Sequence, residues 1–164
     1  MTKIGRKGFM LAEVIVVAVV IATVLVTIYT GLNNISSAYE TRNRYYDIDS
    51  LYVAMEINNI LMKKSASTIN TTEAMKLSDN GEIEIFENFY KKTGNVVYSY
   101  ITPYNKNKII SLKSFNNNNS FSDYIDYLNG NLDFDADYDY MVVVERRENN
   151  NNDDCYYYAL KLNY

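Results

Sequence analysis

Histidine and tryptophan are absent from the 164-residue chain, and cysteine and proline occur once each. Without histidine the chain cannot form a histidine general base, a histidine-activated nucleophile or a histidine metal site. The single cysteine, Cys155, excludes an internal disulfide and a multi-cysteine zinc site. The formal net charge is −4, which disfavours a basic nucleic-acid-binding surface. These absences argue against most enzymes, and the sequence predicts no catalytic residue and no cofactor.

Charge is also almost absent from residues 9–32, FMLAEVIVVAVVIATVLVTIYTGL, where Glu13 is the only charged side chain. As a helix this segment would be roughly 36 Å long, and a bilayer core of about 30 Å needs about 20 apolar residues. The segment has no polar face, so it predicts a membrane-spanning helix. Lys3, Arg6 and Lys7 directly precede it, which favours a cytoplasmic N-terminus and an extracytoplasmic remainder.

A conventional secretory signal is the competing interpretation of this segment. Such a signal has an apolar core of about 7–15 residues followed by a small-x-small cleavage site. Here the apolar run is longer, contains a carboxylate near its start and ends in TIYTGLNN. The sequence therefore favours a helix that stays in the membrane.

The junction RKGFMLAE, residues 6–13, places a basic pair and a glycine before the phenylalanine that opens the apolar run. It resembles the leader and helix start of type IV pilins and of the pseudopilins of type II secretion and competence systems. The resemblance covers about residues 3–35. It implies that a prepilin peptidase cleaves between Gly8 and Phe9 and methylates the new N-terminus. Type IV pilins often have a proline about two-thirds along this helix, whereas residues 27–31 here have none.

Glu13 lies four residues after Phe9, about one helical turn. A carboxylate within a membrane helix costs about 2.5–3.5 kcal/mol and usually has a function. In a fibre of packed helices, Glu13 could pair with the Phe9 amine of a neighbouring subunit and so fix the axial register. Alternatively, the side chain reaches the lipid headgroups or is protonated. The flanking KGF favours the assembly role.

The resemblance implies three parts: a leader (1–8), a transmembrane and assembly helix (9–32) and an extracytoplasmic α+β head (33–164). The partners it implies are other pilin or pseudopilin subunits, a prepilin peptidase, an assembly platform protein with its ATPase, and membrane lipid. Direct nucleic-acid binding is not expected. The expected location is the cell membrane, with assembly at the cell surface. A single-pass surface protein with a ligand-binding head is the alternative, although a simple anchor needs neither KGF nor Glu13.

Beyond the apolar run, helical spacing extends from Ile35 to Met62 and predicts that an amphipathic helix continues from the membrane helix. Its apolar positions are Ile35, Ala38, Tyr39, Tyr45, Ile48, Leu51, Tyr52, Met55 and Met62. A short helical turn is possible at 73–77. Period-two alternation then predicts strands at 82–86, 96–101 and 108–115, and a final hairpin of 138–146 with 155–162. Residues 121–128 fit a helix or a strand. The prediction is an α+β fold with a long N-terminal helix against an antiparallel sheet.

Four acidic residues alternate with apolar and aromatic ones just before that hairpin: Asp133, Asp135, Asp137 and Asp139. Carboxylates in a loop could bind calcium, which takes six to eight oxygen ligands. The segment lacks the glycine and distal glutamate of an EF-hand loop, and strict alternation would spread all four acids along one strand face. A solvated acidic strand face is therefore the favoured interpretation, and no metal site is predicted. Cys155 opens a strand and is expected to be a small buried residue.

Overall fold

The computed structural model describes residues 4–63, 73–77, 87–88, 91, 94–151 and 153–163, with side chains described from Met10 onward. These residues form two compact units, Met1–Thr41 and Arg42–Tyr164, whose boundary falls near the end of the first helix. Together they contain a long N-terminal helix and a four-stranded antiparallel sheet with further helices, so the predicted α+β class is confirmed.

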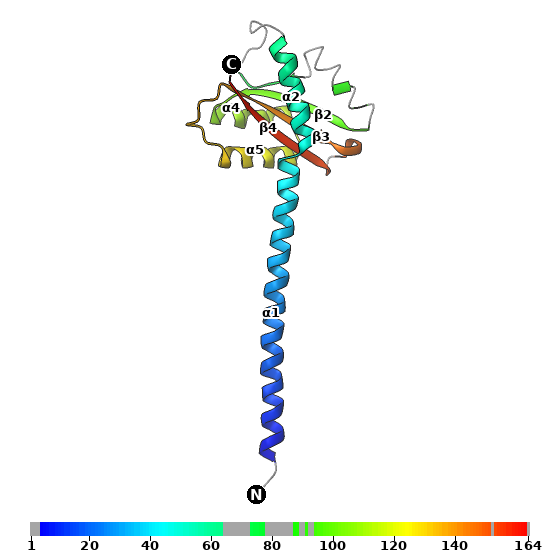
Figure 1. Ribbon diagram of the computed structural model, residues 1–164, viewed down its shortest axis with the longest axis vertical. Coiled ribbons are helices and arrows are strands. Elements are labelled where there is room, and N and C mark those ends of the chain that lie inside the picture. Colours follow the sequence, from blue (N-terminus) through cyan, green and yellow to red (C-terminus); the bar gives the residue numbers. More distant parts are fainter. Residues whose placement is uncertain are drawn as a thin grey trace. The chain divides into compact units, whose positions relative to one another are not determined.

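Helix α1 spans Ile4–Tyr45 and runs without interruption through Gly8 and Gly31 (Figure 1). Its 42 residues correspond to about 63 Å of helix. Nearly every described side chain of its apolar stretch is exposed; for example, Val14 is 65% and Leu25 60% exposed. This helix therefore has no partner for its apolar surface within its own unit.

The predicted continuous helix from Ile35 to Met62 is wrong at one point. The chain leaves the helix at Tyr46 and Asp47, and a separate helix α2 begins at Ile48 and ends at Lys63. The predicted apolar face of this stretch is also wrong. In α2, Ile48, Tyr52, Met55 and Met62 are between 48% and 65% exposed, whereas the buried residues are Ser50, Val53, Ala54, Ile57 and Leu61.

The sheet has the order β1-β2-β3-β4, with strands β1 (Met75–Lys76), β2 (Val96–Pro103), β3 (Tyr140–Arg147) and β4 (Cys155–Leu162). Every pair is antiparallel. The predicted strand at 96–101 and the final hairpin are confirmed. The helical turn considered at 73–77 is wrong, because its centre pairs with β2. The strand predicted at 82–86 lies outside the described residues.

The strand predicted at 108–115 is also wrong. Helix α4 (Lys106–Ser111) passes directly into the 3-10 helix η2 (Leu112–Phe115), and helix α5 (Asn119–Asn131) follows. Residues 121–128, which fitted either element, are thus helical. Side chains of Asn105 and Asn118 accept hydrogen bonds from the first turns of α4 and α5; such N-caps stabilise a helix by about 1 kcal/mol.

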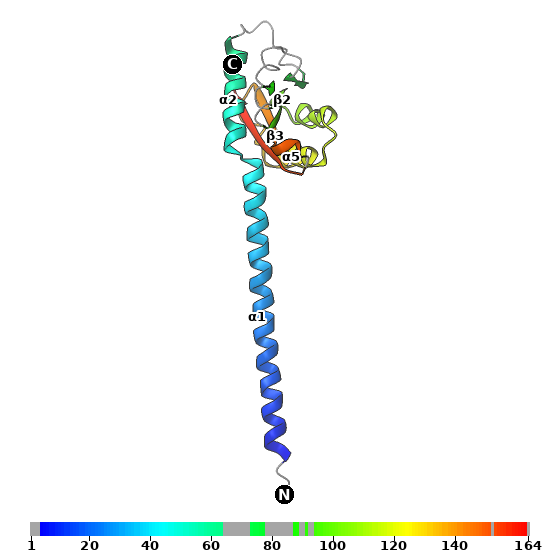
Figure 2. The ribbon, with the colours of Figure 1, turned by 90° about the vertical axis from the view of Figure 1, so that its right-hand side faces the viewer.

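Helices cover both faces of the sheet, as the two views of the ribbon show (Figures 1 and 2). Alternate residues of β3 point to opposite faces. Val142 and Val144 pack with the buried side of α2, and Met141 and Val143 pack with α4, η2 and α5. The Arg42–Tyr164 unit therefore has three layers. The core between the sheet and α4, η2 and α5 is rich in aromatic rings, among them Tyr100, Phe121, Tyr124 and Tyr157.

Candidate functional site

The first candidate region is the apolar part of α1. Among the described residues, one helix is long and apolar enough to cross a membrane, and it lies near the N-terminus. Its most apolar 18-residue window has a mean hydropathy of 2.8, and none of that window is buried. A soluble core helix of this composition would be buried, so the exposed surface is consistent with a helix whose solvent is lipid.

Threonine hydroxyls within this stretch are satisfied by the helix itself. Thr23 Oγ1 donates to the Val20 carbonyl at 2.8 Å, and Thr27 Oγ1 donates to the Thr23 carbonyl at 2.8 Å. Thr30 Oγ1 reaches the carbonyls of Val26 and Thr27 at 3.0 Å each. Unsatisfied polar groups are costly in a hydrocarbon environment. Because each of these hydroxyls donates to a carbonyl of its own helix, threonine is compatible with a membrane-spanning segment.

Gly8, Phe9 and Glu13, the residues predicted to be processed or to direct assembly, all lie on the continuous helix α1. Glu13 is exposed and is flanked by exposed apolar residues such as Leu11 and Val14. It has no hydrogen bond or ion pair with the described residues.

Ion pairs lie at the end of β3 on both faces of the sheet, and Arg146 also pairs with Glu148 at 2.9 Å. On the α2 face, Arg146 Nε and Nη2 donate to the two oxygens of Asp47 at 3.0 Å each. Asp47 also accepts from the backbone and hydroxyl of Ser50, at 2.8 and 2.7 Å, and therefore caps α2. Burial by itself would raise the pKa of Asp47, but the hydrogen bonds from Arg146 and Ser50 outweigh it and lower that pKa.

On the opposite face, Glu145 is fully buried and accepts a hydrogen bond from Arg147 Nε at 2.7 Å. Asn116 Nδ2 donates to the same carboxylate and, at 3.1 Å, to the Tyr100 hydroxyl. The Arg147 guanidinium also lies 4.7 Å from the ring centre of Tyr98. A buried carboxylate is costly unless it is paired and hydrogen-bonded, and this arrangement meets both conditions.

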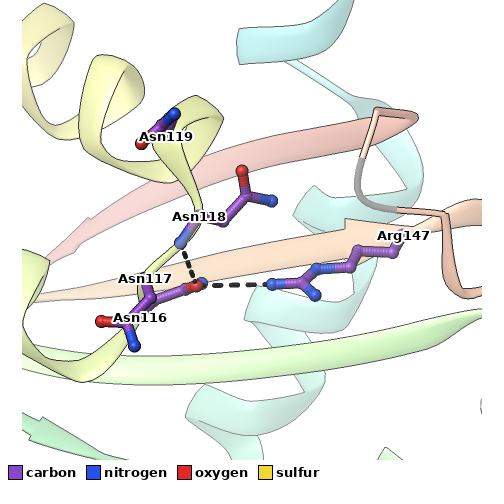
Figure 3. Close-up of a pocket in the computed structure, with 5 residues that line it drawn as sticks. All are labelled: Asn116, Asn117, Asn118, Asn119 and Arg147. Carbon is purple, nitrogen blue, oxygen red and sulfur yellow. Dashed lines mark hydrogen bonds between the residues drawn. The ribbon is translucent and has the colours of Figure 1, made fainter.

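A polar pocket of about 390 Å³ lies over this ion pair and is lined by Asn116, Asn117, Asn118, Asn119 and Arg147 (Figure 3). The sequence did not predict this pocket. The run of four asparagines beside helical residues was the only signal in the sequence. Arg147 comes from β3, far from the asparagines in the sequence, so the pocket could not be predicted from a local pattern.

Cys155 is 1% exposed, which confirms that it is a small buried residue. Burial raises the pKa of its thiol, and the negative charge of Glu145 raises it further. Because the thiolate is the reactive form, a raised pKa makes the sulfur a poor nucleophile. Cys155 is therefore a structural residue.

The acidic strand face predicted at residues 133–139 is wrong, because these residues form turns and irregular chain before β3 begins at Tyr140. Phe134 packs against Tyr104, with ring centres 5.5 Å apart. All four acids, Asp133, Asp135, Asp137 and Asp139, are exposed. Within the described part of the chain, no three or more histidine, cysteine or acidic residues are placed to hold a metal ion, so the calcium alternative gains no support.

Comparisons of the chain with protein-family models, curated proteins and solved structures found no match.

Proposed function

We propose that this chain is a structural subunit, major or minor, of a type IV pilus or of a type II secretion or competence pseudopilus. In this proposal the chain enters the membrane as a precursor and is cleaved by a prepilin peptidase. A platform protein and its ATPase then extract it, and it polymerises through helix α1. The single observation that supports the proposal is the combination of RKGF, residues 6–9, with Glu13 at the start of an exposed apolar helix.

The chemistry of assembly follows from two charges. Cleavage after Gly8 would create a positively charged amine on Phe9, one helical turn from Glu13. A lone charge in an apolar environment is unfavourable, and pairing with an opposite charge offsets part of that cost. A subunit that aligns its Glu13 with the amine of a neighbour removes both unpaired charges. Other axial registers leave them unpaired, so the pair selects one.

Mass spectrometry of the mature protein tests the proposal directly. In a host with an active prepilin peptidase, we expect an N-terminal Phe9 that carries one methyl group. Replacing Gly8 by a bulkier residue should leave the precursor uncleaved, and replacing Gly31, which lies in the same helix but far from the junction, should not. A mature chain that still begins at Met1, or that begins near Tyr39, would refute the proposal.

The alternative, an anchored surface protein whose head binds a ligand, predicts a different outcome. Such a protein would keep residues 1–8 and would tolerate any apolar replacement of Glu13. It would also fractionate with membranes and be absent from sheared surface fibres. Shearing the cells and probing both fractions therefore separates the two functions.

A further inference from the structure

The asparagine-lined pocket, residues 116–119 with Arg147, is the feature of the Arg42–Tyr164 unit that the proposed function does not use. Its volume of about 390 Å³ is within the range of about 300–1,000 Å³ that is typical of small-molecule sites. All five lining side chains are polar. Most small-molecule pockets are lined by apolar side chains, so this one fits a ligand that is itself polar.

The rear of the pocket is held in place by buried groups. Asn116 is fixed by Tyr100, Glu145 and the Asn118 backbone, and Asn118 Oδ1 caps α5 through the Ser120 amide at 2.9 Å. Figure 3 shows Arg147 reaching from β3 toward the Asn116 amide, with Nη2 and Oδ1 3.4 Å apart. Two amides and a guanidinium are therefore set before any ligand arrives, which reduces the entropic cost of binding.

The charge balance of the pocket disfavours a simple anion. Among the described residues that line the pocket, Arg147 alone is charged, and its positive charge is already matched by the fully buried Glu145 at 2.7 Å. A phosphate or carboxylate would have to compete with Glu145 for the guanidinium. A neutral ligand faces no such competition.

Asn117 and Asn119 add hydrogen-bond donors and acceptors to the lining, and Figure 3 shows them on opposite sides of Asn118. Asn117 and Asn119 are exposed and their amides make no side-chain hydrogen bond with the described residues. Each amide provides both an acceptor oxygen and an NH₂ donor. A hydroxyl group also donates and accepts, so hydroxyls on opposite sides of a sugar ring match these separated amides, whereas an anion can use only the donors. We propose that the pocket binds a neutral saccharide ring, with Asn117 and Asn119 contacting its hydroxyls.

Saturation-transfer NMR on the full-length chain tests this proposal. The protein is kept in lauryldimethylamine oxide, a detergent without a sugar headgroup, and glucose, galactose, mannose and N-acetylglucosamine are titrated one at a time. We expect at least one of them to bind saturably with a Kd on the order of 1 mM. The double variant Asn117→Ala/Asn119→Ala should weaken this binding at least about tenfold, because two hydrogen bonds are lost.

Asn107→Ala is the matched control, since Asn107 is another exposed asparagine at the start of a helix but lies outside the pocket. It should bind the sugar as the unaltered chain does, and circular dichroism should show that all variants are folded. Inorganic phosphate serves as the anionic probe. The proposal is overturned if none of the four sugars binds, if the double variant binds as well as the unaltered chain, or if phosphate binds the pocket more tightly than every sugar.

Discussion

Glu13 is the only charged side chain in the 24 residues from Phe9 to Leu32. A charged side chain costs about 2.5–3.5 kcal/mol at the centre of a membrane helix and less near its end, where Glu13 lies, so replacing it by valine should favour insertion. If its function is to pair with a neighbouring amine, the same replacement should hinder polymerisation. Its effects on insertion and on assembly should therefore have opposite signs.

We predict that Glu13→Val leaves membrane insertion intact and reduces incorporation into surface fibres at least tenfold, as measured by immunoblotting of sheared fractions. A register pair worth 1.4 kcal/mol already accounts for about a tenfold change. Glu40→Val, a change of the same type in the same helix but outside the apolar stretch, is the control and should assemble normally. Normal incorporation of the Glu13 variant would show that the carboxylate does not set the register.

Asp47 and Arg146 form the most extensively hydrogen-bonded ion pair among the described residues, with side chains 13% and 6% exposed. Asp47→Asn removes the charge that accepts two hydrogen bonds from Arg146, while Arg146 keeps its ion pair with Glu148 at 2.9 Å. The expected cost is therefore that of hydrogen bonds to a charged group, about 2 kcal/mol. We predict that Asp47→Asn lowers the free energy of unfolding of the full chain in detergent by about this amount, as measured by urea titration with tyrosine fluorescence. Asparagine also caps helices well, so the loss reports on the charge.

Asp49→Asn is the control for that measurement, because Asp49 is 71% exposed and lies 3.7 Å from Arg146; it should cost well under 1 kcal/mol. The pH dependence gives a second check. The pKa of Asp47 is lowered in the folded chain, so its contribution is fully present above the unfolded pKa of about 3.9 and is lost as the pH falls through the folded value. A difference between the unaltered chain and Asp47→Asn that stayed constant below pH 4 would contradict the ion pair.

At the scale of elements, the apolar pattern of segment 108–115 fits a strand in the sequence prediction and a helix in the structure, and the two make different predictions. In the structure Ile109 and Leu112 are fully buried, three residues apart as in a helix, and Ile110 is 38% exposed. In a strand, Ile110 and Leu112 would share a face and Ile109 would point away. The helix predicts that alanine at 109 or 112 costs about 2–4 kcal/mol and that alanine at 110 costs less than 1 kcal/mol.

Urea titrations of the three alanine variants measure these differences within one short segment, so Ile110→Ala is an internal control. A large loss at 110 together with a small loss at 109 would indicate a strand. The second helical layer, α4 with η2 and α5, would then have to be replaced by a larger sheet.

At the scale of the whole molecule, the formal net charge is negative both before and after the predicted cleavage. Cleavage after Gly8 would remove the three cations Lys3, Arg6 and Lys7 and take the formal net charge from −4 to −7. Tight binding to DNA needs clustered basic residues that displace counterions from phosphates. In the described part of the chain, the adjacent pair Arg146 and Arg147 is already engaged by Asp47 and Glu145.

We therefore predict that the full chain in detergent binds duplex DNA no more tightly than about 10⁻⁴ M at physiological salt, the weak end of non-specific binding. Fluorescence anisotropy with a labelled duplex measures this, and lysozyme, a basic protein, is the positive control. If the chain is a competence subunit, DNA contact then belongs to another subunit of the fibre. Micromolar binding that weakens with added salt would contradict this prediction.

The sequence alone determined the features that depend on neighbouring residues. The apolar run at 9–32, the strands β2, β3 and β4, and the burial of Cys155 follow from composition and short-range periodicity. The prediction that Gly8, Phe9 and Glu13 form one functional unit also needs only residues within two helical turns. Such features are readable because the side chains that decide them are adjacent in the chain.

Tertiary structure decided the rest, because the deciding contacts join distant residues. The break between α1 and α2 depends on Asp47, whose partner Arg146 is 99 positions away. The buried face of α2 is determined by its packing against β3 and β4. The short apolar pattern at 108–115 is helical because its buried side chains pack on the opposite face of the sheet. The asparagine pocket likewise exists only because β3 carries Arg147 to the start of α5. A local pattern indicates which residues are apolar enough to be buried. Only packing against the sheet determines which of them are buried and which side chains they contact.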